Sequence, residues 1–329
     1  MISSKDSSPA ESVRAGSVRA RLRREAVRAL WSVKSAIHLD LNRDPAHCVL
    51  LLGSARSGTT WLGEVLNRHR DFRVLFEPLR PGAVPQLAPF ERIRYLRGDD
   101  RDRARVAAMT ALLSGRMRNP WIDHTTSTLL PRRRLLKEIR ANALAHWFSE
   151  CFPESPLILM VRHPLDVVAS RHQLGWKDHL GEFMADRTLV EDHLAPQRAM
   201  LVGLDDPLVR SVAAWAIETV VPLRLLGPSA CVTFYEVLRE TGETELQRVL
   251  RHAGQQSVGP LGDVLDKPSR TAQASRGHRR GSGRPGGQLF SYQQLKASQV
   301  VLESFALDQV YDVAERMPNA DGIAGLRRR

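Results

Sequence analysis

A glycine-containing turn between an apolar run and a helix-like segment constrains this chain more than any other feature. The apolar run, Val49 to Leu52, is typical of a buried strand. The turn, Gly53 to Trp61, follows it directly, and apolar residues then recur at helical spacing over residues 62–67. A strand, a tight turn and a helix start together aim backbone N–H groups and the positive helix end at a phosphate. The sequence therefore predicts a phosphate-binding loop at residues 53–61, and a glycine-rich turn without a ligand is the alternative.

This loop differs from a nucleotide-binding P-loop at the position that matters most for ATP chemistry. The spacing of Gly53 and Gly58 matches the pattern G-x-x-x-x-G-K-[ST], but Thr59 stands where the lysine is expected. The cation is Arg56, inside the turn, and the apolar run 156–161 ends at Arg162 rather than at a magnesium-binding acid. The pattern therefore favours a phosphate-linked donor that needs no metal, and a P-loop kinase is the alternative.

Three segments resemble those of the sulfotransferases that use 3′-phosphoadenosine 5′-phosphosulfate (PAPS). Residues 53–61 resemble the loop that binds the 5′-phosphosulfate. A strand at 157–161 is followed by Arg162 and, eight residues on, by Ser170, like the second hallmark of that family. Residues 76–79, Phe-Glu-Pro-Leu, are similar to a stretch of the carbohydrate-type sulfotransferases. These matches extend over residues 48–310, so the chain is identified as resembling that family over most of its length.

The resemblance implies a fold, a cosubstrate and a set of site residues. The expected fold is α/β, a P-loop-like three-layer fold with a mainly parallel sheet and helices on both faces. The expected cosubstrate is PAPS, without a metal. The donor-binding residues implied are Arg56, Ser57, Gly58, Thr59, Thr60, Trp61, Arg162, Ser170, Arg280 and Gly281. Trp61 has two interpretations, one beside the adenine and one in the core.

The catalytic residues implied are Arg56 and Glu77. Sulfuryl transfer puts negative charge on the bridging oxygen of the donor, which the guanidinium of Arg56 would stabilise, and it needs a base for the acceptor. Glu77 is the preferred base, with His124 and His163 as further candidates and a structural role expected for His163. Because Pro78 follows, we expect Glu77 to be extended, and we expect burial by its apolar neighbours to raise its pKa.

The alternation of apolar runs and helix-like segments predicts a parallel sheet. Strands are expected at residues 48–53, 73–76, 135–139, 157–161 and 231–235. Helices are expected at 141–151, from 164 onward, and at 207–226, 243–254 and 293–308. Residues 177–205 are polar and carry no clear pattern.

Three regions are expected along the chain. Residues 1–45 are a basic N-terminal extension, partly disordered or an amphipathic helix. The helix-like part, 17–41, has two open interpretations, contact with an anionic membrane surface or packing on the domain. Residues 46–312 form the sulfotransferase domain and 313–329 a C-terminal tail. Within the domain, 268–288 is a flexible loop by composition, and in the resembled family this region closes over the 3′-phosphate of the donor.

Composition limits the partners. The net charge is +12, but no nucleic-acid motif is visible, and a polyanionic cosubstrate accounts for part of this balance. No apolar run approaches the ~20 residues of a membrane span. The three cysteines are scattered without metal-ligand spacing, which predicts a reducing, cytoplasmic setting. The acceptor and the oligomeric state stay open, and a non-catalytic protein that binds the desulfated donor (PAP) is a further alternative.

Overall fold

The computed structural model describes residues 25, 31, 35, 39–256 and 286–327. Most of the segment 17–41 and the predicted donor-binding residues Arg280 and Gly281 lie outside this range. Two described residues of the N-terminal segment contact the domain. The ring of Trp31 lies 4.4 Å from that of His124, between centroids, and Ser35 Oγ donates to Asp123 Oδ2 at 2.6 Å. Contact of this segment with a membrane stays a prediction.

The described chain alternates strands and helices. The strands are β1 (Cys48–Gly53), β2 (Phe72–Phe76), β3 (Arg133–Glu138), β4 (Leu157–Val161) and β5 (Cys231–Phe234). The longer helices are α2 (Thr59–Leu66), α3 (Arg103–Leu113), α5 (Ala145–Cys151), α6 (Pro164–Gln173), α10 (Pro207–Leu225), α11 (Tyr235–Glu240), α12 (Glu243–His252) and α15 (Tyr292–Ser304). The shorter ones are α4 (Pro120–Asp123), α7 (Leu180–Met184), α8 (Arg187–Leu189), α9 (Arg198–Val202) and α16 (Gly322–Leu326). Short segments of other helix types are η1 (Pro45–His47), η2 (Pro85–Phe90), η3 (Asn142–Leu144), η4 (Val190–Leu194), η5 (Ala195–Gln197), η6 (Gly286–Leu289) and η7 (Leu307–Gln309).

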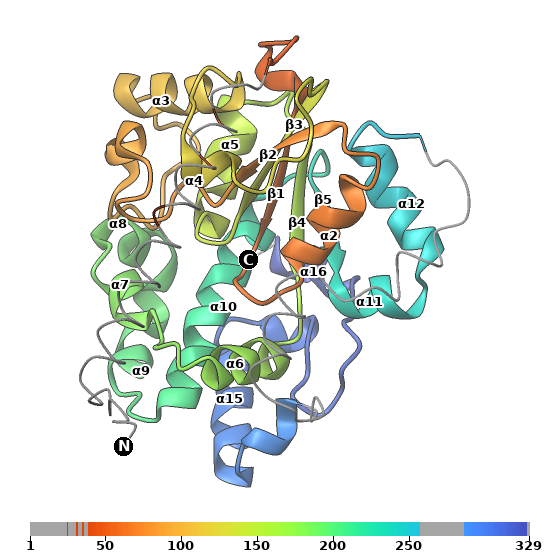
Figure 1. Ribbon diagram of the computed structural model, residues 1–329. Coiled ribbons are helices and arrows are strands. Elements are labelled where there is room, and N and C mark those ends of the chain that lie inside the picture. Colours follow the sequence, from red (N-terminus) through yellow and green to blue (C-terminus); the bar gives the residue numbers. More distant parts are fainter. Residues whose placement is uncertain (1–24, 26–30, 32–34, 36–38, 257–285, 328–329) are drawn as a thin grey trace, which may run out of the picture.

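The five strands form one parallel sheet in the order β2-β3-β1-β4-β5. After the central strand β1 the chain first builds β2 and β3 on one side, and then β4 and β5 on the other. The carboxyl ends of all five strands therefore meet at one edge, from which α2 and α6 start (Figure 1). Ligands of open α/β sheets bind at this edge, where the winding direction changes. The predicted phosphate loop follows β1 at that point.

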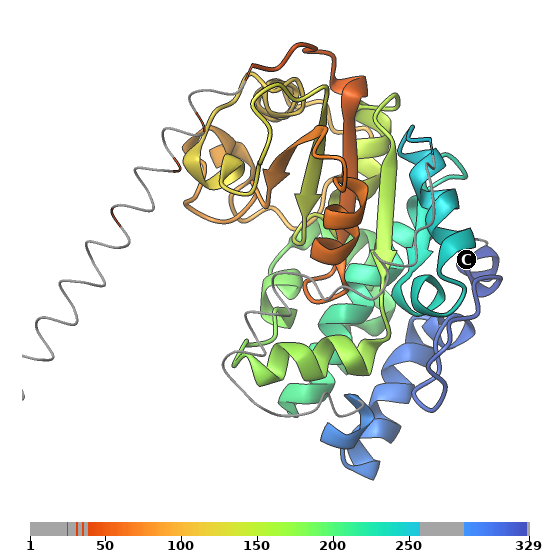
Figure 2. The same cartoon turned by 45° about the vertical axis from the view of Figure 1, so that its right-hand side comes forward.

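Helices cover both faces of the sheet (Figure 2). Along β1 the side chains alternate between two cores, because successive residues of a strand point to opposite faces. Leu50 and Leu52 pack in the core shared with α5, α6 and α10, whereas Val49 and Leu51 pack in the core shared with α2 and α12. Every residue of β1 is buried, which explains its uninterrupted apolar sequence. The three-layer α/β fold predicted from the sequence is confirmed.

Three details differ from the predicted elements or add to them. Tyr235, expected in the last strand, begins α11. The polar segment 177–205 forms α7, α8 and α9 with the turns between them. Residues 313–329, expected as a tail, include α16, whose Leu326 is fully buried. Among the residues that the structure describes, no helix combines the length and apolarity needed to cross a membrane.

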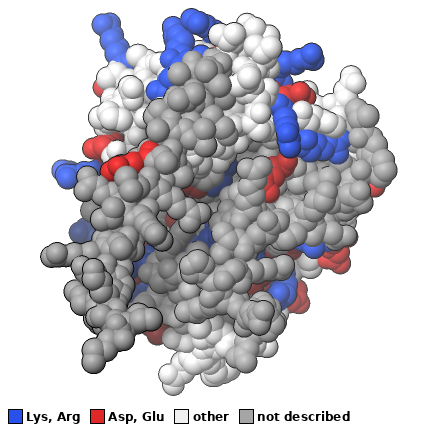
Figure 3. Space-filling view, viewed as in Figure 1, with Lys and Arg blue, Asp and Glu red and all other residues white. Residues whose placement is uncertain are grey.

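Exposed basic side chains in Figure 3 stand out along the upper part of the face, the end at which the strands begin. This end is opposite the loop that follows β1. Part of the positive charge of the chain therefore lies away from the predicted site.

Candidate active site

The loop after β1 needs glycine at both ends. A Cβ on Gly53 would come within 2.6 Å of the carbonyl oxygen of Met160, and one on Gly58 within 2.7 Å of the Tyr235 ring. Gly58 caps α2 with φ of +101°, and Arg56 is also left-handed with φ of +76°. Close packing and these backbone angles together produce the tight turn that the glycine spacing predicts.

Replacing Gly58 by Ala should therefore destabilise the protein more than the backbone angle alone requires. Gly82 is the matched control, because its φ is +69° and a Cβ there would meet nothing within 4 Å. We expect Gly58→Ala to lower the free energy of unfolding by ~1–3 kcal/mol more than Gly82→Ala, the usual cost of overpacking. Urea unfolding of both variants measures the difference. Equal losses would mean that contact with Tyr235 is unimportant.

The loop presents unused hydrogen-bonding capacity at the start of α2. The hydroxyl of Ser57 is buried and has no hydrogen-bond partner among the described residues. A buried polar group without a partner costs free energy. An anion bound in this turn would accept a hydrogen bond from the hydroxyl and remove that cost. Thr59 and Thr60 form the first turn of the helix, whose N–H groups could also donate to an anion bound here. Trp61 is 7% exposed and packs edge-on against Tyr235, so its place is in the core on the α2 side.

The two predicted phosphate-binding motifs meet at one cluster. Arg56 Nε donates to Ser170 Oγ at 2.9 Å, and Arg162 donates to the carbonyl oxygen of Arg56 at 3.2 Å. The Arg162 guanidinium stacks 4.4 Å from the centre of the Tyr235 ring, and its Nε is buried with no partner among the described residues. Burial, and then the charge of Arg162, lower the pKa of Arg56. Two neighbouring cations with a spare donor have the chemistry to bind a multiply charged anion.

Arg162 also has a carboxylate neighbour. Its guanidinium lies 3.6 Å from the carboxylate of Asp166, in the first turn of α6. His163, the residue after Arg162, is the N-cap of that helix. The sequence leaves this acidic partner unassigned, and the structure supplies it from within the same helix.

A hydrogen-bond network that the sequence does not reveal holds the predicted phosphate loop through its residues Ser54 and Ala55. Glu218 of α10 accepts from Ser54 Oγ at 2.6 Å and from Arg171 at 2.8 Å through the same oxygen, Oε2. Arg171 Nε also donates to the carbonyl oxygen of Ala55 at 3.1 Å. Asn142 Nδ2 donates to the backbone carbonyl of Glu218 at 3.1 Å. Because Arg171 follows Ser170 in α6, this network fixes both motifs relative to one another.

Glu77 lies at the carboxyl end of β2, with two cations against its carboxylate. Oε1 accepts from Lys137 Nζ at 2.5 Å and Oε2 from Arg140 at 3.1 Å. Burial alone would raise the pKa of Glu77, but the charges and hydrogen bonds of Lys137 and Arg140 outweigh it and lower the pKa. The expected rise in pKa is therefore wrong. The expected extended backbone is also wrong, since Glu77 is left-handed with φ of +41°.

The two candidate histidines differ in surroundings. His163 is 3% exposed, its Nε2 lies 3.0 Å from the carbonyl oxygen of Asp312, and burial lowers its pKa. These contacts fit the structural role expected for it. His124 Nδ1 lies 2.6 Å from the carbonyl oxygen of Trp121, and its ring packs edge-on against Phe76. His124 is thus part of an aromatic cluster beside β2.

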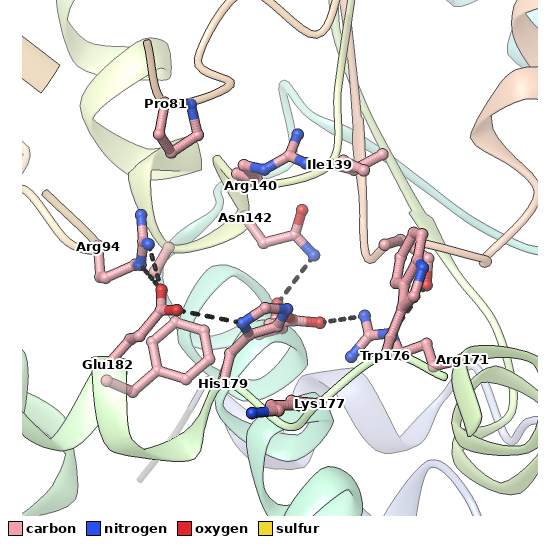
Figure 4. Close-up of a pocket in the computed structure, with 14 residues that line it drawn as sticks. Pro81, Arg94, Ile139, Arg140, Asn142, Arg171, Trp176, Lys177, His179 and Glu182 are labelled. Atoms are coloured by element: carbon pink, nitrogen blue, oxygen red, sulfur yellow. Dashed lines mark hydrogen bonds and ion pairs between the residues drawn. The ribbon is translucent and has the colours of Figure 1, made fainter. Parts of the chain in front are cut away.

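A cavity of about 380 Å³ adjoins the phosphate loop on the side of Ala55 (Figure 4). Its size is typical of a small-molecule site. Glu218 and Arg171 of the loop-holding network line it. The predicted site residues do not, namely Arg56, Glu77, Arg162 and Ser170, although Arg140, the partner of Glu77, does. The other lining residues are Pro81, Arg94, Ile139, Arg140, Asn142, Ala143, Trp176, Lys177, His179, Glu182 and Phe183. The cavity and the cationic cluster are thus adjacent but separate.

The sequence profile of the sulfotransferase family matches residues 48–256, more than half of the chain. The chain therefore belongs to the sulfotransferase family, and it is a transferase of that fold. The search of curated proteins gave no match.

Three solved structures are similar to the chain. They are the sulfotransferase domain from the curacin biosynthetic pathway, sulfotransferase STF9 from Mycobacterium avium, and the sulfotransferase domain from the Synechococcus PCC 7002 olefin synthase. In that order their identities to this chain are 15%, 12% and 14%, and their TM-scores are 0.37, 0.41 and 0.37. The similarity covers 78%, 84% and 85% of this chain and 95%, 79% and 93% of the other chains.

Proposed function

We propose that this sulfotransferase takes its sulfuryl group from PAPS and transfers it directly to a hydroxyl or amine of an acceptor in the cavity. The observation that carries the proposal is the cluster of Arg56, Arg162 and Ser170. It lies beside the loop whose Ser57 hydroxyl has no partner in the described part of the chain. A donor with phosphates at both ends of its ribose would use both motifs. An anion with a single phosphate would leave one of them unused.

Each group has a role that follows from its chemistry. Arg56 and the N–H groups at the start of α2 would stabilise the charge that develops on the 5′-phosphate as the sulfuryl group leaves. Arg162 and Ser170 would bind the 3′-phosphate. Glu77 remains the proposed base, and Lys137 keeps its carboxylate ionised before the acceptor binds. The lowered pKa makes Glu77 a weaker base and favours its ionised, proton-accepting form.

A metal is not part of the proposed reaction. Within residues 39–256 and 286–327, no three His, Cys, Asp or Glu side chains are grouped so that they would hold an ion. Independence from metal stays a prediction that a chelator can test. The cytoplasmic location and the lack of a nucleic-acid partner are likewise predictions.

A screen of acceptors with PAPS tests the function. Sugars, lipids, phenols and amines would be incubated with the full chain, and mass spectrometry would detect an added sulfuryl group together with PAP. We expect an acceptor-dependent product that is unchanged by a chelator. A phosphorylated product formed from ATP and magnesium would instead show a kinase. PAP binding without any turnover would favour a non-catalytic binding protein.

Removing the side chains proposed to bind the 3′-phosphate should weaken the binding of PAP selectively. We expect Arg162→Ala and Ser170→Ala each to weaken PAP by ~10–150-fold, because one charge-assisted hydrogen bond is worth ~1.5–3 kcal/mol. The same variants should bind adenosine 5′-phosphate, which has no 3′-phosphate, nearly as well as the unchanged protein. Calorimetric titration of both ligands measures this, and equal losses would assign these residues to another task.

A further inference from the structure

The cavity beside the phosphate loop contains four cationic side chains, and three of them are already paired. Arg171 pairs with Glu218 at 2.8 Å. Arg140 pairs with Glu77 at 3.1 Å. Arg94 Nε donates to Glu182 at 2.9 Å, and His179 lies 3.3 Å from the other oxygen of that carboxylate. The two acids that line the cavity, Glu182 and Glu218, are therefore both paired.

Lys177 is the fourth cation, and among the described residues it has no acidic partner. Its side chain is exposed and lines the cavity (Figure 4). The adjacent acid, Asp178, is occupied because it pairs with Arg210 at 3.2 Å and accepts from the backbone N–H of Leu180 at 3.1 Å. Lysine is rare in this chain, with six against 42 arginines. Within residues 39–256 and 286–327 nothing acidic pairs with this ammonium, so it could pair with a bound anion.

Trp176, next to this lysine, also lines the cavity and is 42% exposed. The end of α6 positions both residues. Trp176 N–H donates to the carbonyl oxygen of Arg171 at 3.1 Å and Gly175 N–H to that of His172 at 2.9 Å. With Gly175 left-handed at φ of +70°, this is a Schellman motif, which fixes the direction of the chain after the helix. The helix that contains Ser170 thus also delivers an aromatic ring and a cation to the cavity.

Binding of the proposed donor does not explain why Trp176 and Lys177 line the cavity. Arg56, Arg162 and Ser170 form a cluster that does not line the cavity, whereas Trp176 and Lys177 do. The remaining apolar lining includes Ile139 and Phe183. An indole in a cavity that also has apolar lining favours stacking of a flat or cyclic group, and the ammonium favours an anion on the same ligand.

From this arrangement we infer that the acceptor is a hydroxyl-bearing ring with a carboxylate or similar anionic group, stacked on Trp176 and paired with Lys177. The inference rests on the proposed function, because it names the class of molecule that would receive the sulfuryl group. A sugar acid and an aromatic acid share this chemistry. Lys177 would select for the anion, and Trp176 would orient the ring.

Two matched pairs of probes test the inference by binding, so no known acceptor is needed. The first pair is 4-hydroxybenzoate and 4-hydroxybenzamide, and the second is glucuronate and glucose. Dissociation constants would be measured on the full chain, with and without saturating PAP. We expect the carboxylate member of at least one pair to bind about tenfold or more tightly than its neutral partner, the worth of one charge-assisted hydrogen bond. The pair that shows it separates an aromatic acid from a sugar acid.

Variants of exposed residues supply the controls. Lys177→Met keeps the aliphatic stem and should abolish the preference for the anion, whereas Lys296→Met on α15, also an exposed lysine, should retain it. Trp176→Ala should weaken both members of the pair, and Tyr292→Ala, at a residue 81% exposed on α15, should weaken neither.

The inference is overturned if no carboxylate is preferred, if nothing binds, or if the preference survives in Lys177→Met. The stabilisation of the same samples by PAP is recorded separately. A protein that PAP does not stabilise contradicts the proposed donor. A protein that PAP stabilises, but that shows no preference for anions, contradicts only the inferred class of acceptor.

Discussion

Glu77→Gln should lower the turnover of PAPS with an acceptor by ~10²–10⁴-fold, the usual worth of a positioned base. The affinity for PAP should stay the same, because Glu77 lies at the end of β2, outside the cluster of Arg56, Arg162 and Ser170. The amide keeps the size of the side chain but cannot accept a proton. Steady-state rates and PAP titration of the same preparation measure the two quantities.

The buried partner of Glu77 calls for a stability control. Lys137 is 4% exposed, and its ammonium would lose its closest carboxylate in Glu77→Gln. A buried charge left without a partner destabilises a protein. In the double variant Glu77→Gln, Lys137→Met, the stability should therefore recover while the turnover stays low. Recovery of turnover together with stability would show that Glu77 acts only through folding.

Two further variants show where the base lies if it is not Glu77. Near-normal turnover in Glu77→Gln together with an inactive His124→Ala would assign the base to His124. Near-normal turnover in Glu77→Gln together with an inactive Glu218→Gln would instead assign the base to Glu218, which lines the cavity. Since Glu218 also holds Ser54, its variant must still bind PAP for this conclusion to stand.

Arg73→Met should lower the free energy of unfolding by ~3–5 kcal/mol, the cost of breaking a buried ion pair by removal of one partner. Arg73 is fully buried on β2 and pairs with Asp123 at 2.7 Å and with Asp40 at 2.5 Å. It also donates to the backbone carbonyl oxygens of Gly115 and Met117. Methionine fills a similar volume but leaves both carboxylates without this cation. Urea unfolding measures the loss.

An exposed ion pair provides the comparison for Arg73. Arg97 pairs with Asp192 at 2.7 Å, with side chains 55% and 22% exposed. Exposed pairs contribute little because water screens both charges. Arg97→Met should therefore leave the unfolding midpoint close to that of the unchanged protein. A loss in Arg73→Met as small as that in Arg97→Met would mean that Asp40 and Asp123 find other partners.

The sequence predicts the parts of the site that depend on local geometry. A strand, a glycine turn and a helix start are consecutive in the chain, so Gly53 and Gly58 are sufficient to locate the loop. Arg162 at the end of β4 and Ser170 in α6 are also close in sequence, and the structure brings them to Arg56. Parallel strands end at one edge, which explains why two distant motifs meet.

The parts that the sequence does not predict depend on contacts between distant segments. Lys137 is paired with a residue 60 positions away, and this contact reverses the expected shift in the pKa of Glu77. Arg171 and Glu218 meet across 47 positions. The sequence does contain a sign that Glu218 is buried and paired. It is the only charged residue between Ser211 and Leu223, in a mostly apolar stretch of α10. A buried charge in such a helix indicates a partner, but not which one.

Binding of PAP, compared with ATP and magnesium, tests the proposed donor most directly. Thermal unfolding of the full chain would be followed with each ligand, with and without a chelator. At ~100 times its dissociation constant, PAP should add ~2.7 kcal/mol to the stability of the fold. We expect the chelator to leave this gain unchanged, and we expect ATP with magnesium to give no comparable gain. Stabilisation by ATP and magnesium without any by PAP would contradict the account.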